Sequence, residues 1–553
     1  MKKIIALILV LAIIFGGLYL GLKILKGGGF SGNSETSTLF DGFNFISENN
    51  LVPKEDFDRI DGQYYLSYDY IKENIDPDIK FSNDTVVFNN SVGMREYKVN
   101  EKIGYVNGEG IELRDPVIEK EGKILIPIEG FIYDYPVDFR YVEENNLLIL
   151  DFKNKEHQLG YPEGNGTNMR ESNSTSSPIV KKVGPEDLMY VYDNVDGWYQ
   201  VRLKDGYLGY IREDLLKNIG AESALERIER VSNKPLNLVW DYTYGPQSDD
   251  SVANIRYING INVICPTWFS IKDGTGEVVD RGRKDYVEKY NALGIDVWAY
   301  LDNSFDGDVT HDALSNPESR KYTIDRLINL CKKYGLKGVN IDFEQYRIDD
   351  RDNVTTFMEE LYPRCKEEGL VVSIDVTPQI SKDVTKEPYD RAKLALYSDY
   401  VIVMTYDQHW GSSEKAGSVA QYKWVEGNLN NLFRSIPKEK LVLGMPLYSR
   451  YWTTENGKTS SKTVSMAQVN QIVANRGLTP TWDEESKQKY IEFEDNGALK
   501  QIWIEDGESL KWKTTLCLKY NLAGVASWRK DFETMDVWDT IGTVLNKVLY
   551  INQ

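Results

Sequence analysis

The chain has 553 residues, of which 41% are hydrophobic and 27% are charged, and its formal net charge is -20. This length indicates several domains, and the composition is that of a globular protein. The negative charge argues against nucleic acid as a partner, because that binding depends on Lys and Arg neutralising phosphates. With 3 His, 4 Cys, no HExxH and no CxxC pair, we expect no metal centre, no cofactor and no disulfide framework.

An apolar segment opens the chain. Residues 4–22 are apolar residues and glycines without a break, flanked by lysines on both sides. At about 1.5 Å per residue, this run is just long enough to cross a bilayer core. No A-x-A-like cleavage site follows it. Residues 1–26 are therefore predicted to be an uncleaved transmembrane signal anchor, and the Gly-rich residues 27–38 a flexible linker.

Short strand-like runs separated by turn residues fill residues 39–153, as in Lys123–Pro127 and Leu147–Leu150. The segment resembles the small domain first named from the N-terminus of copper amine oxidases, which recurs in bacterial wall proteins. It contains no His, so the resemblance implies no copper. A plain α+β spacer is the alternative interpretation.

A second small domain is predicted over residues 166–218. Strands of about five residues are separated by Asp-Asn and Asp-Gly turns, which predicts a small β-barrel. The elements Gly197-Trp198-Tyr199-Gln200-Val201 and Gly206-Tyr207-Leu208-Gly209-Tyr210-Ile211 resemble those of a bacterial SH3 domain. Because that family often binds peptidoglycan, the resemblance implies wall binding for this segment.

From residue 230 to residue 550, buried-type strands alternate with helical stretches. Several strands are continuous Val and Ile runs, as parallel strands covered on both faces require. This alternation predicts a (β/α)8 TIM barrel. A long gap before the last strand predicts a small β-rich insertion at about residues 452–509. The candidate strands are Leu236–Trp240, Ile261–Cys265, Asp296–Tyr300, Gly338–Phe343, Val371–Val376, Tyr400–Met404, Leu441–Met445 and Gly524–Trp528.

The fourth strand carries acidic residues on one face. Side chains alternate along a strand, so Asn340, Asp342 and Glu344 share the face that points into the barrel. Repulsion between the two carboxylates would raise the pKa of one and keep it protonated near neutral pH, which suits a general acid. A structural polar cluster is the alternative, but unpaired buried acids are costly.

The residues at three strand ends resemble those of family 18 glycoside hydrolases, the chitinase-type enzymes. Lys337 to Glu344 resembles the signature D-G-x-D-x-D-x-E, with Lys337 in place of its first Asp and Asn340 in place of its second. Met404-Thr405-Tyr406-Asp407 resembles M-x-Y-D, and Trp528 resembles the Trp that floors the sugar subsite. The resemblance implies Glu344, Asp342 and Tyr406 as catalytic residues. The substrate-binding residues that we predict are Asn340, Met404, Asp407, Trp528, Trp268 and Trp410.

The resemblance implies a retaining hydrolase that cleaves β-1,4 bonds by substrate-assisted catalysis. Since Asn340 removes one charge, we expect the pKa of Asp342 to be less strongly perturbed. The Asn-Ile-Asp-Phe-Glu version looks most like the branch that acts on bacterial wall and spore-cortex glycans. Peptidoglycan or spore cortex is therefore the expected polysaccharide partner. A chitinase, an endo-β-N-acetylglucosaminidase and a non-catalytic glycan-binding wall protein are the alternatives.

The cellular location follows from this context. The lysines that flank the apolar run are nearly balanced, so they barely orient it. A wall-directed activity and an SH3-like domain favour a single-pass protein of the cell membrane. The catalytic domain is then expected outside the cytoplasm, on the wall side.

Overall fold

The computed structural model describes residues 36–221, 231–243 and 247–550, apart from residues 91, 154 and 156. The anchor predicted at residues 1–26 lies outside this range. Among the described residues, no helix combines the length and the apolar character that a bilayer crossing needs. The described chain divides into two compact units: residues 36–57 with 136–221 form unit 1, and residues 58–135 with 231–550 form unit 2.

Unit 1 begins with a four-stranded sheet of order β12-β13-β1-β2, in which β1 and β13 run parallel. Its apolar side chains, among them Ile46 and Leu147, pack against Leu208 of the SH3-like part of unit 1. A buried ion pair between Arg202 and Asp151 also links the two parts. The elements are β1 (Asn44–Ser47), β2 (Asn50–Leu51), η1 (Lys54–Asp56), β12 (Val137–Val142), η4 (Glu143–Asn145) and β13 (Leu147–Phe152).

The rest of unit 1 is a seven-stranded antiparallel sheet of order β16-β15-β19-β18-β17-β14-β20. Its core includes Met169, Val183, Val201 and Ile211. The short strands and their turns follow the pattern predicted for an SH3-like barrel. The elements are β14 (Gln158–Pro162), β15 (Thr167–Arg170), β16 (Ile179–Val183), β17 (Met189–Val195), β18 (Trp198–Leu203), β19 (Leu208–Arg212), η5 (Glu213–Leu215) and β20 (Leu216–Ala221).

In unit 2, residues 58–135 form two antiparallel sheets, of order β10-β11-β4-β3 and β5-β6-β7-β8-β9. The central part of the domain predicted at residues 39–153 belongs to the same compact unit as the barrel domain. The boundaries of that domain stay a prediction. The elements are β3 (Phe57–Ile60), β4 (Gln63–Ser67), α2 (Tyr68–Asn74), β5 (Lys80–Ser82), β6 (Thr85–Asn90), β7 (Gly93–Lys98), β8 (Ile103–Val106), β9 (Glu109–Glu112), β10 (Ile118–Lys120), β11 (Lys123–Pro127), η2 (Ile128–Gly130) and η3 (Ile132–Asp134).

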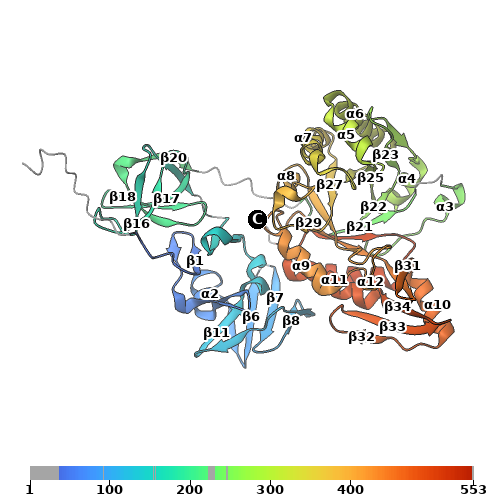
Figure 1. The fold of residues 1–553 in the computed structure, drawn as a ribbon, viewed down its shortest axis with the longest axis horizontal. Coiled ribbons are helices and arrows are strands. Elements are labelled where there is room, and N and C mark those ends of the chain that lie inside the picture. Colours follow the sequence, from blue (N-terminus) through green and yellow to red (C-terminus); the bar gives the residue numbers. More distant parts are fainter. Residues whose placement is uncertain are drawn as a thin grey trace, which may run out of the picture. The chain divides into compact units, whose positions relative to one another are not determined.

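The main body of unit 2 is a closed barrel of eight parallel strands, as predicted (Figure 1). The barrel interior holds an apolar cluster that includes Trp240, Trp298 and Tyr400. The barrel strands are β21 (Leu236–Asp241), β22 (Val263–Pro266), β25 (Asp296–Asp302), β26 (Gly338–Asp342), β27 (Val371–Val376), β28 (Tyr400–Met404), β29 (Leu441–Pro446) and β35 (Gly524–Trp528).

The helices of the barrel carry clear start and stop signals. In α6, Asn316 caps the first turn by accepting from the Glu318 N–H, Pro317 occupies the first turn, and Gly335 ends the helix with φ of 74°. The remaining elements around the barrel are α3 (Asp249–Ala253), β23 (Phe269–Ile271), β24 (Val278–Asp280), α4 (Lys284–Ala292), α5 (Gly307–Ser315), α6 (Pro317–Tyr334), η6 (Ile348–Asp350), α7 (Arg351–Glu367), η7 (Val384–Lys386), α8 (Arg391–Leu396), α9 (Tyr422–Leu432), α11 (Gly507–Tyr520) and α12 (Asp536–Leu545).

An inserted subdomain separates β29 from α11, where the sequence predicts a β-rich insertion. It is a five-stranded antiparallel sheet of order β31-β30-β34-β33-β32 with one helix. Its apolar core includes Val464, Val469 and Ile502. The elements are β30 (Tyr448–Glu455), β31 (Lys458–Ser465), α10 (Met466–Arg476), β32 (Thr481–Asp483), β33 (Gln488–Asp495) and β34 (Ala498–Ile504).

The four cysteines all lie in the barrel domain, and each is a buried thiol. Cys265 is on β22, and the other three are on helices that cover the barrel. They are Cys331 on α6, Cys365 on α7 and Cys517 on α11.

Candidate active site

The predicted site residues stand at the carboxyl ends of three barrel strands. Asp342 ends β26 and Glu344 follows two residues later, Tyr406 comes two residues after β28, and Trp528 ends β35. Val339 and Ile341, the alternate residues of β26, are fully buried against the surrounding layer. The alternation therefore turns the acidic face of β26 inward, at the end of the barrel where TIM-barrel chemistry occurs.

Asp342 is almost fully buried, with 5% of its surface exposed. The Tyr300 hydroxyl donates a hydrogen bond of 2.6 Å to its Oδ2. Its Oδ1 is buried and has no hydrogen-bond partner among the described residues. Burial raises the pKa of Asp342 well above its ordinary value, and the nearby Glu344 and Asp375 carboxyls raise it further.

Glu344 is half-buried. The Asn303 side chain binds both the N–H and the carbonyl of its backbone. Asn303 donates from Nδ2 to the Glu344 carbonyl at 2.7 Å and accepts from the Glu344 N–H at 3.1 Å. Burial raises the pKa of Glu344 to about 7, with further contributions from the Asp407 and Asp302 carboxylates. A carboxyl with this pKa is protonated at slightly acid pH and can act as a general acid.

A further buried carboxyl lies beside this pair. Asn340 is fully buried and donates from Nδ2 to Asp375 Oδ1 at 2.8 Å, and Asp375 on β27 is 1% exposed. The expectation that Asn340 leaves the pKa of Asp342 less perturbed than an aspartate would stays a prediction. Asp375 returns a carboxyl to the cluster, and burial and the charge of Glu344 raise the pKa of Asp375 itself.

Tyr406 belongs to the same cluster. Its pKa is raised well above its ordinary value, first by burial and then by the charges of Asp342, Asp375 and Glu344. The phenol therefore stays protonated and can donate a hydrogen bond. Met404, two residues earlier, is buried with 7% exposed.

Asp407 lies at the mouth of the barrel and is partly exposed. Tyr448 and Arg450 of the inserted subdomain donate hydrogen bonds to its Oδ1 at 2.8 and 3.0 Å. Its backbone has φ of 55°, a left-handed conformation that a non-glycine residue adopts at a cost. The insertion therefore fixes this carboxylate beside the acidic cluster.

The predicted aromatic residues differ in exposure. Trp528 is partly exposed, and its ring lies 5.9 Å from that of Trp240. Trp410 is 57% exposed, so its indole is free to stack on a sugar ring. Trp268 is fully buried and packs edge-on against Tyr286 at 5.0 Å. The prediction that Trp268 lines a glycan cleft is therefore corrected, because its ring is part of the protein interior.

One group of side chains has the composition of a metal site. Ligand atoms of Glu48, Asp151 and His157 in unit 1 lie within 4.8 Å of one another. His157 Nε2 contacts Glu48 at 2.7 Å, and Asp151 pairs with Arg202 and with Arg140. The two arginines already neutralise Asp151, so the group is best described as an ion-pair network.

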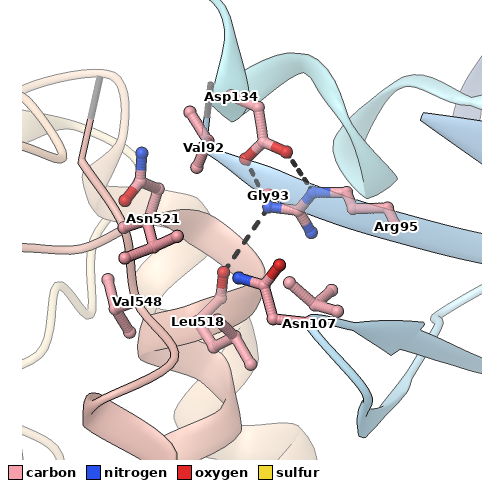
Figure 2. Close-up of a pocket in the computed structure, with 10 residues that line it drawn as sticks. Val92, Gly93, Arg95, Asn107, Asp134, Leu518, Asn521 and Val548 are labelled. Carbon is pink, nitrogen blue, oxygen red and sulfur yellow. Dashed lines mark hydrogen bonds and ion pairs between the residues drawn. The ribbon is translucent and has the colours of Figure 1, made fainter. Parts of the chain in front are cut away.

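A small pocket elsewhere in unit 2 is shown in Figure 2. Arg95 Nη2 donates to the Leu518 carbonyl at 3.5 Å, and Asn107 Nδ2 donates to the Lys547 carbonyl at 2.6 Å. Asn521, which also lines the pocket, precedes β35. The pocket is thus at the amino end of this strand, whereas Glu344 and Tyr406 follow the carboxyl ends of theirs.

Comparison with protein families gives two matches. Residues 304–533 match glycosyl hydrolases family 18, and residues 165–217 match the bacterial SH3 domain. The prediction that the chain is a glycoside hydrolase is confirmed. The resemblance of residues 39–153 to the copper amine oxidase domain stays a prediction.

Two curated relatives of this chain come from Bacillus subtilis. The uncharacterized glycosylase YvbX is 26% identical over 298 residues, which cover 52% of this chain and 85% of that protein. The cortical fragment-lytic enzyme is 23% identical over 273 residues, or 48% of this chain and 63% of that protein.

Solved structures share the fold. The spore cortex-lytic enzyme SleL of Bacillus megaterium aligns with a TM-score of 0.52 and 17% identity, over 61% of this chain and 78% of that chain. The chitinase of Chromobacterium violaceum aligns with a TM-score of 0.51 and 20% identity, over 56% and 99%. At this level of identity, the likeness concerns the fold alone.

The sequence reasoning missed three residues that support the family 18 site. Tyr300 contacts Asp342, Asn303 holds the backbone of Glu344, and Asp375 contacts Asn340. For Asp375 a signal was present, because Ser373 and Asp375 are polar residues on one face of an otherwise apolar strand.

Proposed function

We propose that this chain cleaves the β-1,4 bonds of an N-acetylglucosamine-containing polymer, namely peptidoglycan or spore cortex, by substrate-assisted catalysis. The buried Oδ1 of Asp342, without a partner among the described residues, is the observation that carries the proposal. A buried acceptor without a donor is costly. The N–H of an acetamido group is a donor of the kind that this position lacks.

The steps use three side chains of the cluster. Glu344 gives its proton to the glycosidic oxygen as the bond to the anomeric carbon breaks, and the substrate's acetamido oxygen attacks that carbon. Asp342 accepts the acetamido N–H, and Tyr406 donates to the acetamido oxygen. Water then attacks the anomeric carbon and opens the oxazolinium ring. Glu344, now a carboxylate, takes a proton from that water.

The remaining residues of the site bind the sugar. Trp528 offers its partly exposed ring beneath the reacting sugar, and Trp410 offers an indole further from it. Asp407 lies beside the acidic residues and Met404 adds an apolar surface. Asn340 contacts carboxyl and indole groups rather than solvent, so we propose an indirect role for it.

Digestion of purified peptidoglycan, spore cortex and chitin oligomers tests the proposal. Reducing-end mass spectrometry identifies the new termini, and Glu344→Gln is the inactive control. Glu426→Gln is a matched control, since Glu426 is also buried but pairs with Lys519 behind the barrel wall. New N-acetylglucosamine ends from peptidoglycan or cortex support the proposal. Cleavage of chitin alone would indicate a chitinase, and binding without turnover a glycan-binding protein.

We further propose that residues 1–26 anchor the chain in the cell membrane, with the catalytic domain on the wall side. The apolar run of residues 4–22 supports this location. The SH3 domain would add contacts to the wall polymer. Cell fractionation of the whole chain and of a chain lacking residues 1–26 tests the anchor, and release of the shortened chain from the membrane fraction is the expected result.

A further inference from the structure

Arg529 directly follows Trp528 at the carboxyl end of β35, and its side chain is partly exposed. Its guanidinium carbon lies 4.5 Å from the centre of the Tyr242 ring and 4.0 Å from the centre of the Phe532 ring. A planar guanidinium stacks well on aromatic faces. The two rings therefore hold this cation in one place, next to the residue that floors the proposed sugar subsite.

Both rings belong to the catalytic end of the barrel. Tyr242 directly follows β21, and its ring is perpendicular to that of Trp528, with 6.5 Å between the ring centres. The Phe532 ring lies 6.2 Å from that of Tyr448, whose hydroxyl donates to Asp407. One of the two rings thus adjoins the proposed sugar floor, and the other adjoins the inserted subdomain.

This arginine is not neutralised, unlike two other cations at the same end of the barrel. Lys530 lies 3.4 Å from Asp241, and Arg450 lies 3.0 Å from Asp407. The Arg529 side chain forms no hydrogen bond and no ion pair with any residue that the structure describes. Its five N–H donors form a fork that matches a carboxylate. The fork is therefore available to an anionic group of a bound molecule.

The charge of the site explains why such a cation matters. Four carboxyl groups gather at this end of the barrel, those of Asp342, Glu344, Asp375 and Asp407, and the whole chain has a net charge of -20. An acidic site repels an anionic ligand. A neutral glycan needs no cation here, whereas a glycan that carries carboxylates needs one to offset the repulsion.

We propose that Arg529 is a specificity-determining residue, which binds a carboxylate on the sugar next to the one that lies over Trp528. This inference rests on the proposed function. N-acetylglucosamine alternates with N-acetylmuramic acid in peptidoglycan, so a muramic residue flanks the reacting N-acetylglucosamine on each side. Its lactyl group ends in a free carboxylate or carries a stem peptide with carboxylates of its own. Chitin has neither group, so Arg529 favours wall glycan over chitin.

Steady-state kinetics of the whole chain and of Arg529→Gln tests the inference on three substrates. They are chitin oligomers, peptide-free wall glycan with lactyl carboxylates, and peptide-bearing peptidoglycan. The variant is expected to raise KM for a carboxylate-bearing substrate by about tenfold or more. Its kcat/KM on chitin oligomers is expected to stay within about twofold of the wild type, because no charge is bound there. An effect on peptide-free glycan identifies the lactyl carboxylate, and an effect on peptidoglycan identifies the stem peptide.

Two further variants separate recognition from packing. Arg529→Lys keeps the charge but loses the planar fork, so an intermediate KM is expected. Arg476→Gln is the matched control, since Arg476 lies over the Phe493 ring of the inserted subdomain at 4.4 Å. It removes the same charge and should keep the wild-type KM on all three substrates. The inference is wrong if Arg529→Gln leaves KM unchanged on both wall substrates, or if it impairs chitin cleavage equally.

Calorimetry gives a second readout that needs no turnover. The whole chain with Glu344→Gln is compared with the double variant Glu344→Gln/Arg529→Gln, using peptide-free wall tetrasaccharide and chitin tetrasaccharide as ligands. The double variant is expected to raise Kd about tenfold for the wall ligand alone. An equal Kd for that ligand overturns the inference. Binding that depends on Arg529, without cleavage of any polymer by the wild type, would instead count against the proposed function alone.

Discussion

At the scale of single residues, the chemistry depends on which carboxyl holds a proton. Glu344 has a pKa of about 7, chiefly because it is removed from water. A general acid works only in its protonated form. The activity is therefore expected at acid to neutral pH and should fall as the pH rises through about 7.

The first prediction concerns Glu344→Gln, which is expected to lower kcat by about 10²–10⁴-fold, since the amide cannot give a proton. Initial rates of reducing-end release, measured from about pH 5 to about pH 9, check this result and the wild-type limb. Wild-type activity that persists unchanged at the upper end of this range would contradict the assignment.

The Tm of Glu344→Gln serves as a control for damage to the fold. The folded-state pKa is raised, so the wild-type protein loses stability as the pH rises from the ordinary value of 4.5 through about 7. Glu344→Gln is therefore expected to have a higher Tm than the wild type above pH 7 and a similar Tm below pH 4.5. A lower Tm at every pH would mean that the substitution damages the fold.

The second prediction concerns Tyr300→Phe. The Tyr300 hydroxyl bond holds down the pKa of Asp342, so its loss raises that pKa further. The acid limb of kcat/KM is expected to move to higher pH, and kcat to fall by about 10-fold or more. Tyr290→Phe is the control, since Tyr290 is an equally buried phenol on α4. The idea fails if both variants show the same pH profile.

The sequence predicted which site residues of a single strand lie together. It did not predict the contacts that depend on how neighbouring strands pair. Asn340, Asp342 and Glu344 share one face of a strand whatever their neighbours are. The contacts of Tyr300 and Asp375 arise only from the pairing of β25, β26 and β27. Trp268 shows the opposite error, because its place after a strand does not reveal that the ring turns into the interior.

At the scale of elements, neighbouring strand ends support one another. Asn303, just beyond β25, binds both the N–H and the carbonyl of Glu344. Tyr389 donates to the Phe343 carbonyl at 2.8 Å and braces the same turn. The acid is thus positioned by its backbone, which leaves its carboxyl group available to a substrate.

The third prediction concerns Asn303→Ala. Loss of both backbone bonds misplaces the Glu344 carboxyl, and a shift of about 1 Å can lower kcat by about 10²-fold. KM is expected to change little, because the sugar-stacking rings are untouched. Steady-state kinetics separates the two parameters. Asn237→Ala is the control, since Asn237 donates to the Gly260 carbonyl near the amino end of β21. It should lower Tm and spare kcat.

Strand positions were predictable because their apolar runs are continuous, and all eight barrel strands lie where the sequence places them. The grouping of residues 58–135 with the barrel was not predictable. It depends on contacts between residues far apart in the chain, such as Glu109 with Lys511 and Lys547. No local pattern reveals such pairs.

At the scale of the whole molecule, residues 58–135 and the barrel domain pack together within unit 2. Arg95 and Asp134 form an ion pair with both side chains buried. Breaking a buried pair leaves an uncompensated charge, which costs more than the pair contributes. This pair therefore holds the small sheets together, and Arg95 Nη2 also donates to the Leu518 carbonyl of the barrel domain at 3.5 Å.

The fourth prediction concerns Arg95→Met, which is expected to destabilise residues 58–135 by about 3–5 kcal/mol. Hydrogen exchange read by mass spectrometry measures the opening of these sheets directly, which suits a protein of several units. The double variant Arg95→Met/Asp134→Leu is expected to recover much of the loss. Equal hydrogen exchange in the single variant and the wild type would contradict the prediction. An unchanged kcat would show that the active site of the variant is intact.

The four buried thiols give the barrel a built-in reporter of its own opening. Burial raises the pKa values of Cys265, Cys331 and Cys365, so these side chains are poor nucleophiles in the folded protein. A thiol-reactive dye will label the folded chain slowly and the unfolded chain at once. Labelling rates then measure kinetic stability without any substrate, and thiol oxidants in the surroundings reach these four side chains only when the barrel opens.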